Sequence, residues 1–217
     1  MSDQCPPFSL PRGNAANSFR PHLVAFVTIA ALSWGCGDST GPAIDQTKAI
    51  AADPVGDTFG GGAVPWDVTA LSIVRDAGGV TVRLTFSKDV VSPVSGDPAA
   101  MIGFVDLDVD QNAGTGITPT VDEFRVRPGS TGMGADFELD LANYLPDGSV
   151  AVRDAHGVET GRVTPVFSAR DVAVYIPKEL LGNDDGFLNA AAIVGATAGP
   201  SDIVPENGHL TVGNNPK

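Results

Sequence analysis

The chain has 217 residues, enough for one domain of ordinary size, and its formal net charge is −13 at pH 7. The excess of acidic residues disfavours nucleic-acid binding through a basic face, and it disfavours adhesion to anionic lipid headgroups. The same charge suits an acidic extracellular domain, a domain that binds divalent cations, or a domain with a basic partner.

Residues 1–35 are predicted to be an export signal. Arg12 and Arg20 supply positive charge, and residues 22–32 form an apolar run that is too short to span a bilayer. A small residue, then Cys36, then a polar glycine-containing stretch resembles a bacterial lipoprotein processing site. That resemblance implies a lipid on the Cys36 thiol and an anchor on the extracytoplasmic side of the cell envelope, at the outer membrane or cell surface. The alternative is ordinary signal cleavage, which would leave Cys36 free.

The mature chain would hold a single cysteine, because Cys5 leaves with the signal and Cys36 remains. An intrachain disulfide is therefore excluded, and the fold must be held by its core and by any bound metal. By composition, the chain after the signal is divided into a flexible tether at 36–52, a folded domain at 53–210 and a tail at 211–217.

Most of the predicted elements are short strands, because apolar and polar residues alternate with period two. Residues 80–86 alternate without error, and a hairpin signal at 76–79 joins them to a strand at 66–75. Further strands are predicted at 101–108, 123–127, 137–141, 150–152, 163–167, 171–176 and 187–197.

Residues 177–182 are predicted to form a single helical turn that Gly182 closes. No long segment has helical periodicity, and turn signals recur about every ten residues. The sequence therefore predicts an all-β fold, an antiparallel sandwich of two sheets.

The acidic stretch from Phe104 to Gly116 is the main chemical signal. Asp106, Asp108 and Asp110 alternate with apolar residues, so in a strand they would share one face. At an effective dielectric of about 20, neighbouring carboxylates in such a ladder repel by roughly 2 kcal/mol. A straight strand would spread the three over about 13 Å, so sharing one ion requires the chain to turn near Asp108.

Calcium is the predicted ion, because it prefers six to eight hard oxygen ligands. Asp106, Asp108, Asp110 and Asn112 resemble the alternating oxygen ligands of an EF-hand loop. The glycine and glutamate of that loop are missing, and no helices are predicted to flank the stretch, so an EF-hand is excluded. The alternative is a solvated strand face that charge protects against edge pairing.

Acidic turns elsewhere offer further ligands. Asp53 and Asp57 lie in a glycine-containing turn at the start of the domain, and Asp202 lies near its end. They are predicted either to complete the same cation site or to form a second one. Asp136 begins a strand and is as well explained by turn capping as by metal binding.

The order of these motifs resembles the DOMON-like sandwiches, which are similar to the family-nine carbohydrate-binding modules. The motifs are Asp53-x-x-Gly-Asp57, the acidic stretch, Gly134-Ala-Asp136-Phe, Ile176-Pro with Leu181-Gly182, and Asp202-x-x-Pro205-x-x-Gly208. The resemblance covers about residues 50–210 and implies a calcium-stabilised β-sandwich that serves as an accessory or binding domain. Sugar-binding members place a pair of tryptophans where the mature chain has only Trp66.

The predicted function is therefore a non-catalytic binding or surface-interaction domain, with a glycan or an envelope protein as partner. A carbohydrate-binding module that uses Trp66 as its aromatic platform is the first alternative. A secreted hydrolase that uses an acidic pair is the second, although the chain has no His-Glu-x-x-His or Gly-x-Ser-x-Gly motif.

Overall fold

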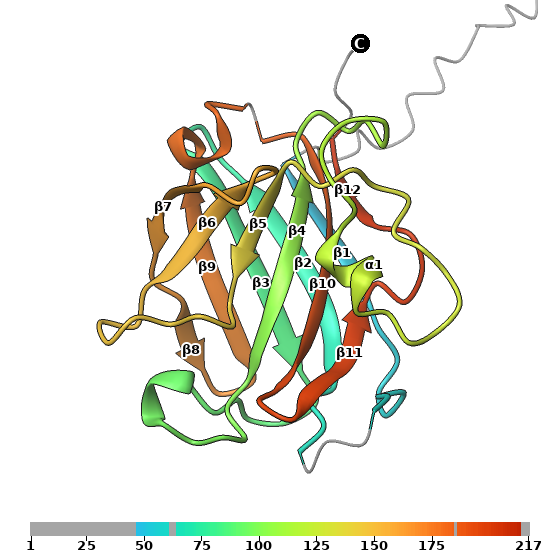
Figure 1. Cartoon of the computed structure of the whole chain (residues 1–217), viewed down its shortest axis with the longest axis vertical. Helices are drawn as coiled ribbons and strands as arrows, with labels where there is room; N and C mark the ends of the chain where they lie inside the picture. Colours follow the sequence, from blue (N-terminus) through green and yellow to red (C-terminus); the bar gives the residue numbers. More distant parts are fainter. Residues whose placement is uncertain (1–46, 61–63, 185, 214–217) are drawn as a thin grey trace, which may run out of the picture. The chain divides into compact units, whose positions relative to one another are not determined.

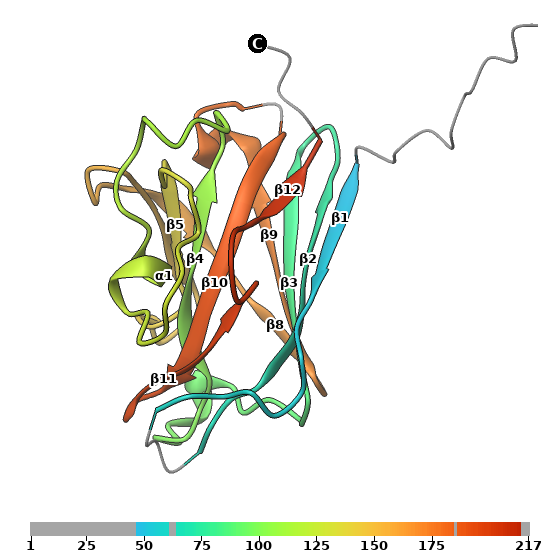
Figure 2. The same cartoon turned by 90° about the vertical axis from the view of Figure 1, so that its right-hand side faces the viewer.

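Two antiparallel sheets carry almost all of the regular structure in a computed structural model that describes residues 47–60, 64–184 and 186–213. Figure 1 labels the strands, and Figure 2 shows the two sheets edge-on as separate layers. The predicted fold class, an all-β antiparallel sandwich, is confirmed.

The smaller sheet, here called sheet A, has the strand order β1 (Lys48–Ala52), β2 (Val68–Arg75), β3 (Gly79–Phe86), β9 (Asp171–Pro177) and β8 (Val166–Ser168). The larger, sheet B, has the order β11 (Gly199–Val204), β10 (Leu188–Ala196), β4 (Ile102–Asp108), β5 (Phe137–Asp140), β6 (Val150–Asp154) and β7 (Glu159–Val163). β12 (Leu210–Val212) also pairs with β10.

The helical segments are single turns. They are α1 (Thr120–Glu123) and the 3-10 turns η1 (Pro93–Ser95) and η2 (Lys178–Leu181). η2 ends at Gly182, whose backbone is left-handed with φ of 69°. The helical turn predicted at 177–182 is therefore confirmed, and glycine ends it because a left-handed residue carries no steric cost without a Cβ.

The core lies between the sheets and follows the period-two pattern. On β3 the alternate residues Val80, Val82, Leu84 and Phe86 are all buried. β10 differs because all nine of its residues are buried. One of its faces packs into the sandwich core, and the other packs beneath α1 and the segment that follows it, through Ala191 and Ile193. This second cover explains why the strand is rich in small apolar residues.

Several predicted boundaries are wrong. β1 begins at Lys48, inside the expected tether, and pairs along its length with β2. β12 reaches Val212, inside the expected tail. Residues 123–127 are not a strand, since α1 ends at Glu123 and the chain continues as a loop. The expected strand at 163–167 is split at Pro165, which has no N–H to donate, so β7 belongs to sheet B and β8 to sheet A.

Candidate metal centre

Four acidic side chains converge where the edges of the two sheets meet. One carboxylate oxygen from each lies within 4.8 Å of the others, and the residues are Asp53, Asp57, Asp202 and Glu206. Asp53 directly follows β1, and Asp57 lies in the turn beyond it. Asp202 belongs to β11, and Glu206 lies in the turn between β11 and β12. We call these four residues the edge group.

Strand pairing explains how residues so far apart in the chain meet. β4 pairs with one edge of β10, so β11 and β12 share the other edge, and the chain leaves that edge between Val204 and Leu210. Glu206 lies on this excursion. On the sheet A side, the backbone N–H of Asp53 donates to the carbonyl of Thr69 at 2.9 Å, which extends the pairing of β1 with β2 up to the site.

Hydrogen bonds hold β11 against the chain that leads into β2, and one of them runs from the Ser201 hydroxyl to the carbonyl of Trp66 at 2.8 Å. Asp202 Oδ2 accepts from the backbone N–H of Val68 at 2.7 Å. The Ser201 hydroxyl accepts from the N–H of Trp66 at 2.9 Å, and the Ser201 carbonyl accepts from the N–H of Phe59 at 2.8 Å. The backbone around the edge group is therefore fixed on both sides.

The edge group is partly buried and incompletely hydrogen-bonded. Asp202 is fully buried and Asp53 is 8% exposed. Asp53 Oδ2 and Asp57 Oδ1 are buried and accept no hydrogen bond from the described residues. A buried carboxylate oxygen without a partner is costly, so these two atoms are in the state that a bound cation would satisfy.

Burial also opposes ionisation of these carboxyl groups. It raises the pKa of Asp53 to about 8, with further contributions from the charges of Asp202 and Asp57. The pKa of Asp202 is raised to about 7, again chiefly by burial, and burial raises the pKa of Asp57 as well. A divalent cation among the carboxylates would favour their ionised forms. The group can therefore hold a metal ion, and its ligands are all hard oxygens.

A second group consists of Asp108, Asp110 and Asp136, which also approach within 4.8 Å. We call it the loop group. β4 ends at Asp108, and the chain turns through Gln111, whose φ is 52°. The turn predicted near Asp108 is therefore present.

The carboxylates of the loop group already accept hydrogen bonds from the protein. Asp108 accepts from the Asn189 side-chain amide and from the N–H of Asn112, each at 3.0 Å. Asp136 Oδ2 accepts from the N–H of Val109 at 3.0 Å, and further donors serve Asp110 from Asn112 and Thr115. Turn capping accounts for much of this arrangement. In the edge group, by contrast, two buried carboxylate oxygens have no hydrogen-bond partner among the described residues.

Asp106 does not join either group of carboxylates, and Asn112 contacts the loop group through its backbone N–H, which donates to Asp108 and Asp110. Asp106 is buried beneath α1, where its Oδ2 accepts from the N–H of Val121 at 2.8 Å. Burial raises the pKa of Asp106 to about 7, and Glu138 lies opposite it on β5. Asn112 Oδ1 accepts from the N–H of Gly114 within the turn. Of the ligands predicted at 106–112, Asp106 is therefore separated from the others, while Asp108, Asp110 and Asn112 stay together in the turn.

Trp66 is a core residue. Its ring is 1% exposed, packs edge-on against Phe86 with ring centroids 5.9 Å apart, and donates from Nε1 to the carbonyl of Ala99 at 2.9 Å. The alternative in which this ring serves as a platform for a sugar is not supported, because the residue is buried.

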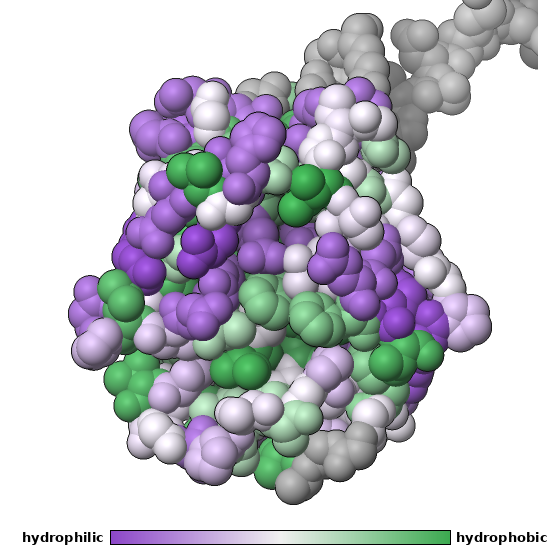
Figure 3. Space-filling view, viewed as in Figure 1, coloured by the Kyte–Doolittle hydropathy of each residue, from purple (hydrophilic) through white to green (hydrophobic). Residues whose placement is uncertain are grey.

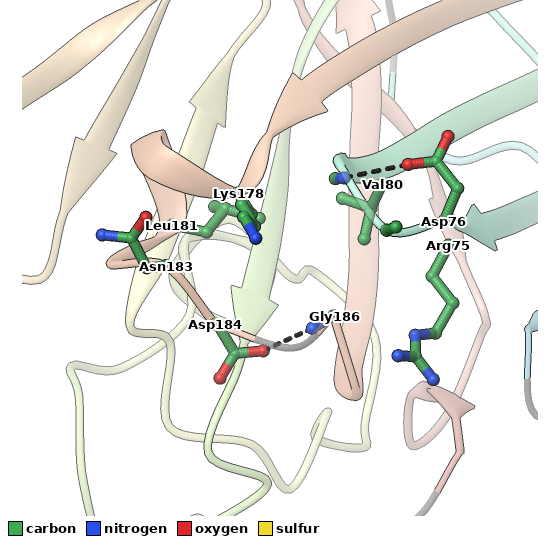
Figure 4. A pocket seen from close by; sticks show the side chains of 10 residues that line it. Arg75, Asp76, Val80, Lys178, Leu181, Asn183, Asp184 and Gly186 are labelled. Atoms are coloured by element: carbon green, nitrogen blue, oxygen red, sulfur yellow. Dashed lines mark hydrogen bonds between the residues drawn. The ribbon is translucent and has the colours of Figure 1, made fainter.

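Several pockets lie away from the edge group, and two of them differ in the chemistry of their lining. The first, of about 280 Å³, is bounded by the β2–β3 hairpin and η2 and contains side chains of both charges, including Arg75, Asp76 and Lys178 (Figure 4).

The second is an apolar groove of about 180 Å³ on the outer face of sheet B, where Phe104 and Phe124 stack with centroids 6.2 Å apart. Figure 3 shows apolar residues gathered on this face. No titratable side chain lines the groove, so it offers no acid or base.

Glu206 is the member of the two groups that was not predicted as a ligand, and for Asp136 the sequence left metal binding and turn capping equally open. Asp136 was recognisable as a turn carboxylate, while Glu206 had one signal, its place four residues after Asp202 in a turn with proline and glycine. Cys36, the predicted site of lipidation, lies outside the described residues. Within the described residues, no helix is long and apolar enough to cross a membrane.

No protein-family model matches the chain, and a search of the curated proteins finds no match either.

Proposed function

We propose that this protein is an exported, lipid-anchored β-sandwich whose folded domain is stabilised by calcium and serves as a non-catalytic binding domain at the cell envelope. The observation that carries the proposal is the edge group. It combines four converging carboxylates with two buried, unpartnered oxygens, at a place where an ion would join sheet A to sheet B.

The donor set supports calcium as the ion. Two oxygens on opposite sides of a calcium ion lie about 4.8 Å apart, because each bond is about 2.4 Å long. The oxygens of Asp53, Asp57, Asp202 and Glu206 fall within that separation. None of them is a nitrogen or sulfur ligand of the kind that zinc prefers. Backbone carbonyls and water would complete the six to eight ligands that calcium takes.

Export and anchoring are supported by the sequence at the N-terminus. Positive charge, a short apolar run and Cys36 followed by polar residues fit a processed and lipidated signal. Labelling cells with a palmitate analogue tests this part. Label that disappears in Cys36→Ala supports the anchor, and unlabelled wild-type protein overturns it.

Binding rather than catalysis is supported by the chemistry of the domain. The edge group lies between two sheets, and Asp202 within it is fully buried. The proposed partner is a glycan or an envelope protein, and the net charge of −13 disfavours nucleic acid. For a glycan, the burial of Trp66 removes the aromatic platform on which that alternative depended.

Thermal unfolding tests the cation site. Binding to the native state alone must raise the free energy of unfolding, by roughly 2.7 kcal/mol at a hundredfold excess of calcium over Kd. We expect a higher melting temperature in calcium than in EDTA, and we expect Asp53→Asn to abolish the difference. Asp136→Asn is the matched control, since it removes a charge from the loop group. An equal melting temperature in calcium and EDTA would overturn the proposal.

A further inference from the structure

Arg127 places a positive charge at the rim of the edge group. Its Nη1 lies 2.9 Å from Glu206 Oε1, and its Nη2 donates a hydrogen bond to the backbone carbonyl of Asp57. The guanidinium also lies over the ring of Phe59, 5.3 Å from its centroid. One side chain therefore contacts both chain segments that supply the carboxylates.

Glu206 is the one member of the edge group that is ion-paired within the described parts of the chain. The ion pairs there include Arg127 with Glu206 but none that involves Asp53, Asp57 or Asp202. Arg127 also opposes the rise in the pKa of Asp57, so its charge is felt by a second carboxylate. The guanidinium thus offsets part of the negative charge that a metal ion would neutralise.

The segment that carries Arg127 has other attachments to the same turn. Arg125 donates from Nη1 to the carbonyl of Glu206 at 2.6 Å and pairs through Nε with Asp122 at 3.2 Å. The backbone N–H of Gly208 donates to the carbonyl of Ser130 at 3.0 Å. Arg127 can therefore be changed without detaching this segment from the turn that holds Glu206.

We propose that Arg127 is an internal competitor of the cation: its guanidinium holds the Glu206 carboxylate when no ion is bound, and an entering divalent ion must displace it. This inference rests on the cation site proposed above. It identifies Arg127 as the residue that limits the affinity of that site for the ion. A guanidinium stays positively charged in proteins, so Arg127 cannot escape the repulsion by becoming neutral. The positive charge at the rim must therefore either move or weaken ion binding.

A competitor and a structural clamp predict opposite effects of the same substitution. Arg127→Gln removes the charge but keeps an amide that can donate a hydrogen bond. If Arg127 competes, calcium should bind more tightly to this variant, by up to about fivefold, which is the change that one screened charge interaction produces. If Arg127 only positions Glu206, calcium should bind more weakly. Arg127→Lys keeps the charge, so its affinity should stay closer to that of the wild type.

The experiment is a calorimetric calcium titration of the whole mature protein as wild type, Arg127→Gln, Arg127→Lys and Arg162→Gln. The last is the control, since Arg162 is likewise a partly exposed arginine, paired with Glu159 at 3.0 Å on another part of sheet B. Tighter binding by Arg127→Gln alone supports the inference. Unchanged or weaker binding by Arg127→Gln overturns the inference but leaves the cation site standing.

The remaining outcomes are also decisive. If neither the wild type nor Arg127→Gln binds calcium, both the site and the inference fall. If Arg127→Gln folds only when calcium is present, the ion has replaced the arginine charge and the inference stands. If this variant stays unfolded in calcium as well, Arg127 is a clamp and the inference is overturned.

Discussion

Asp202 and Val68 join the two sheets through a single hydrogen bond of 2.7 Å between a carboxylate oxygen and a backbone N–H. Asp202 lies on β11 at the edge of sheet B, and Val68 begins β2 of sheet A. Both residues are fully buried, so no water replaces the bond if it is broken. Asp202 therefore has a structural role that is separate from its negative charge.

Substitutions at position 202 should separate these two roles. Asp202→Ala leaves the N–H of Val68 without its acceptor, which costs about 1–3 kcal/mol in the free energy of unfolding. Asp202→Asn keeps an acceptor and removes only the charge, so in EDTA it should be the more stable of the two. Both variants should lose the stabilisation by calcium. Urea denaturation measures each effect, and equal stability of the two variants in EDTA would contradict the structural role.

The stability of the calcium-free protein should fall as the pH rises from about 5 to about 8. Asp53 and Asp202 have ordinary pKa values of 3.8, which rise to about 8 and about 7 in the folded state. Across that interval the folded protein retains protons that the unfolded chain releases, so a rising pH favours unfolding. Urea midpoints in EDTA at pH 5 and pH 8 check the sign. A higher midpoint at pH 8 would refute it, and Asp53→Asn should flatten the dependence.

Period-two alternation predicted the architecture well, because burial of alternate residues is a local property of each strand. β3 is the clearest case, with its four apolar positions all buried. β1 was missed because its segment does not alternate between apolar and polar, and Ile50 at its centre is 68% exposed. Its strand conformation comes from pairing with β2, which is a long-range interaction.

The candidate site was predictable only in part for a similar reason. Asp53, Asp57 and Asp202 stood out as carboxylates in turns or at strand ends, which is a local signal. Glu206 and Arg127 reach the site through the path of the chain between β11 and β12 and through the segment after α1. Conversely, the regular spacing of Asp106 and Asp108 indicated a shared ion, but the covering segment supplies a separate backbone donor for Asp106.

Replacing Trp66 should destabilise the fold rather than affect a surface. The ring is buried against Phe86, so Trp66→Ala should cost about 3–5 kcal/mol through lost burial and the resulting cavity. Phe124→Ala is the control, because Phe124 is 48% exposed and should cost much less. Denaturant unfolding of the two variants gives the comparison. Native-like stability of Trp66→Ala would show that the ring does not pack as described.

Asp122 should hold the segment after α1 in place. Burial alone would raise its pKa, but hydrogen bonds from Thr131, Ser130 and Arg125 outweigh burial and hold the pKa below its ordinary value. Asp122→Ala removes these bonds at once, so amide hydrogen exchange in residues 122–131 should accelerate. Asp147→Ala, in a separate exposed turn, is the control. Unchanged exchange in the segment would mean that other contacts hold it.

The most direct test of the cation site is a crystal structure grown in calcium, with anomalous scattering recorded to locate the ion. The account predicts a peak among Asp53, Asp57, Asp202 and Glu206, about 2.4 Å from their carboxylate oxygens. A structure with no peak there, or with a peak only at Asp108, Asp110 and Asp136, would contradict it.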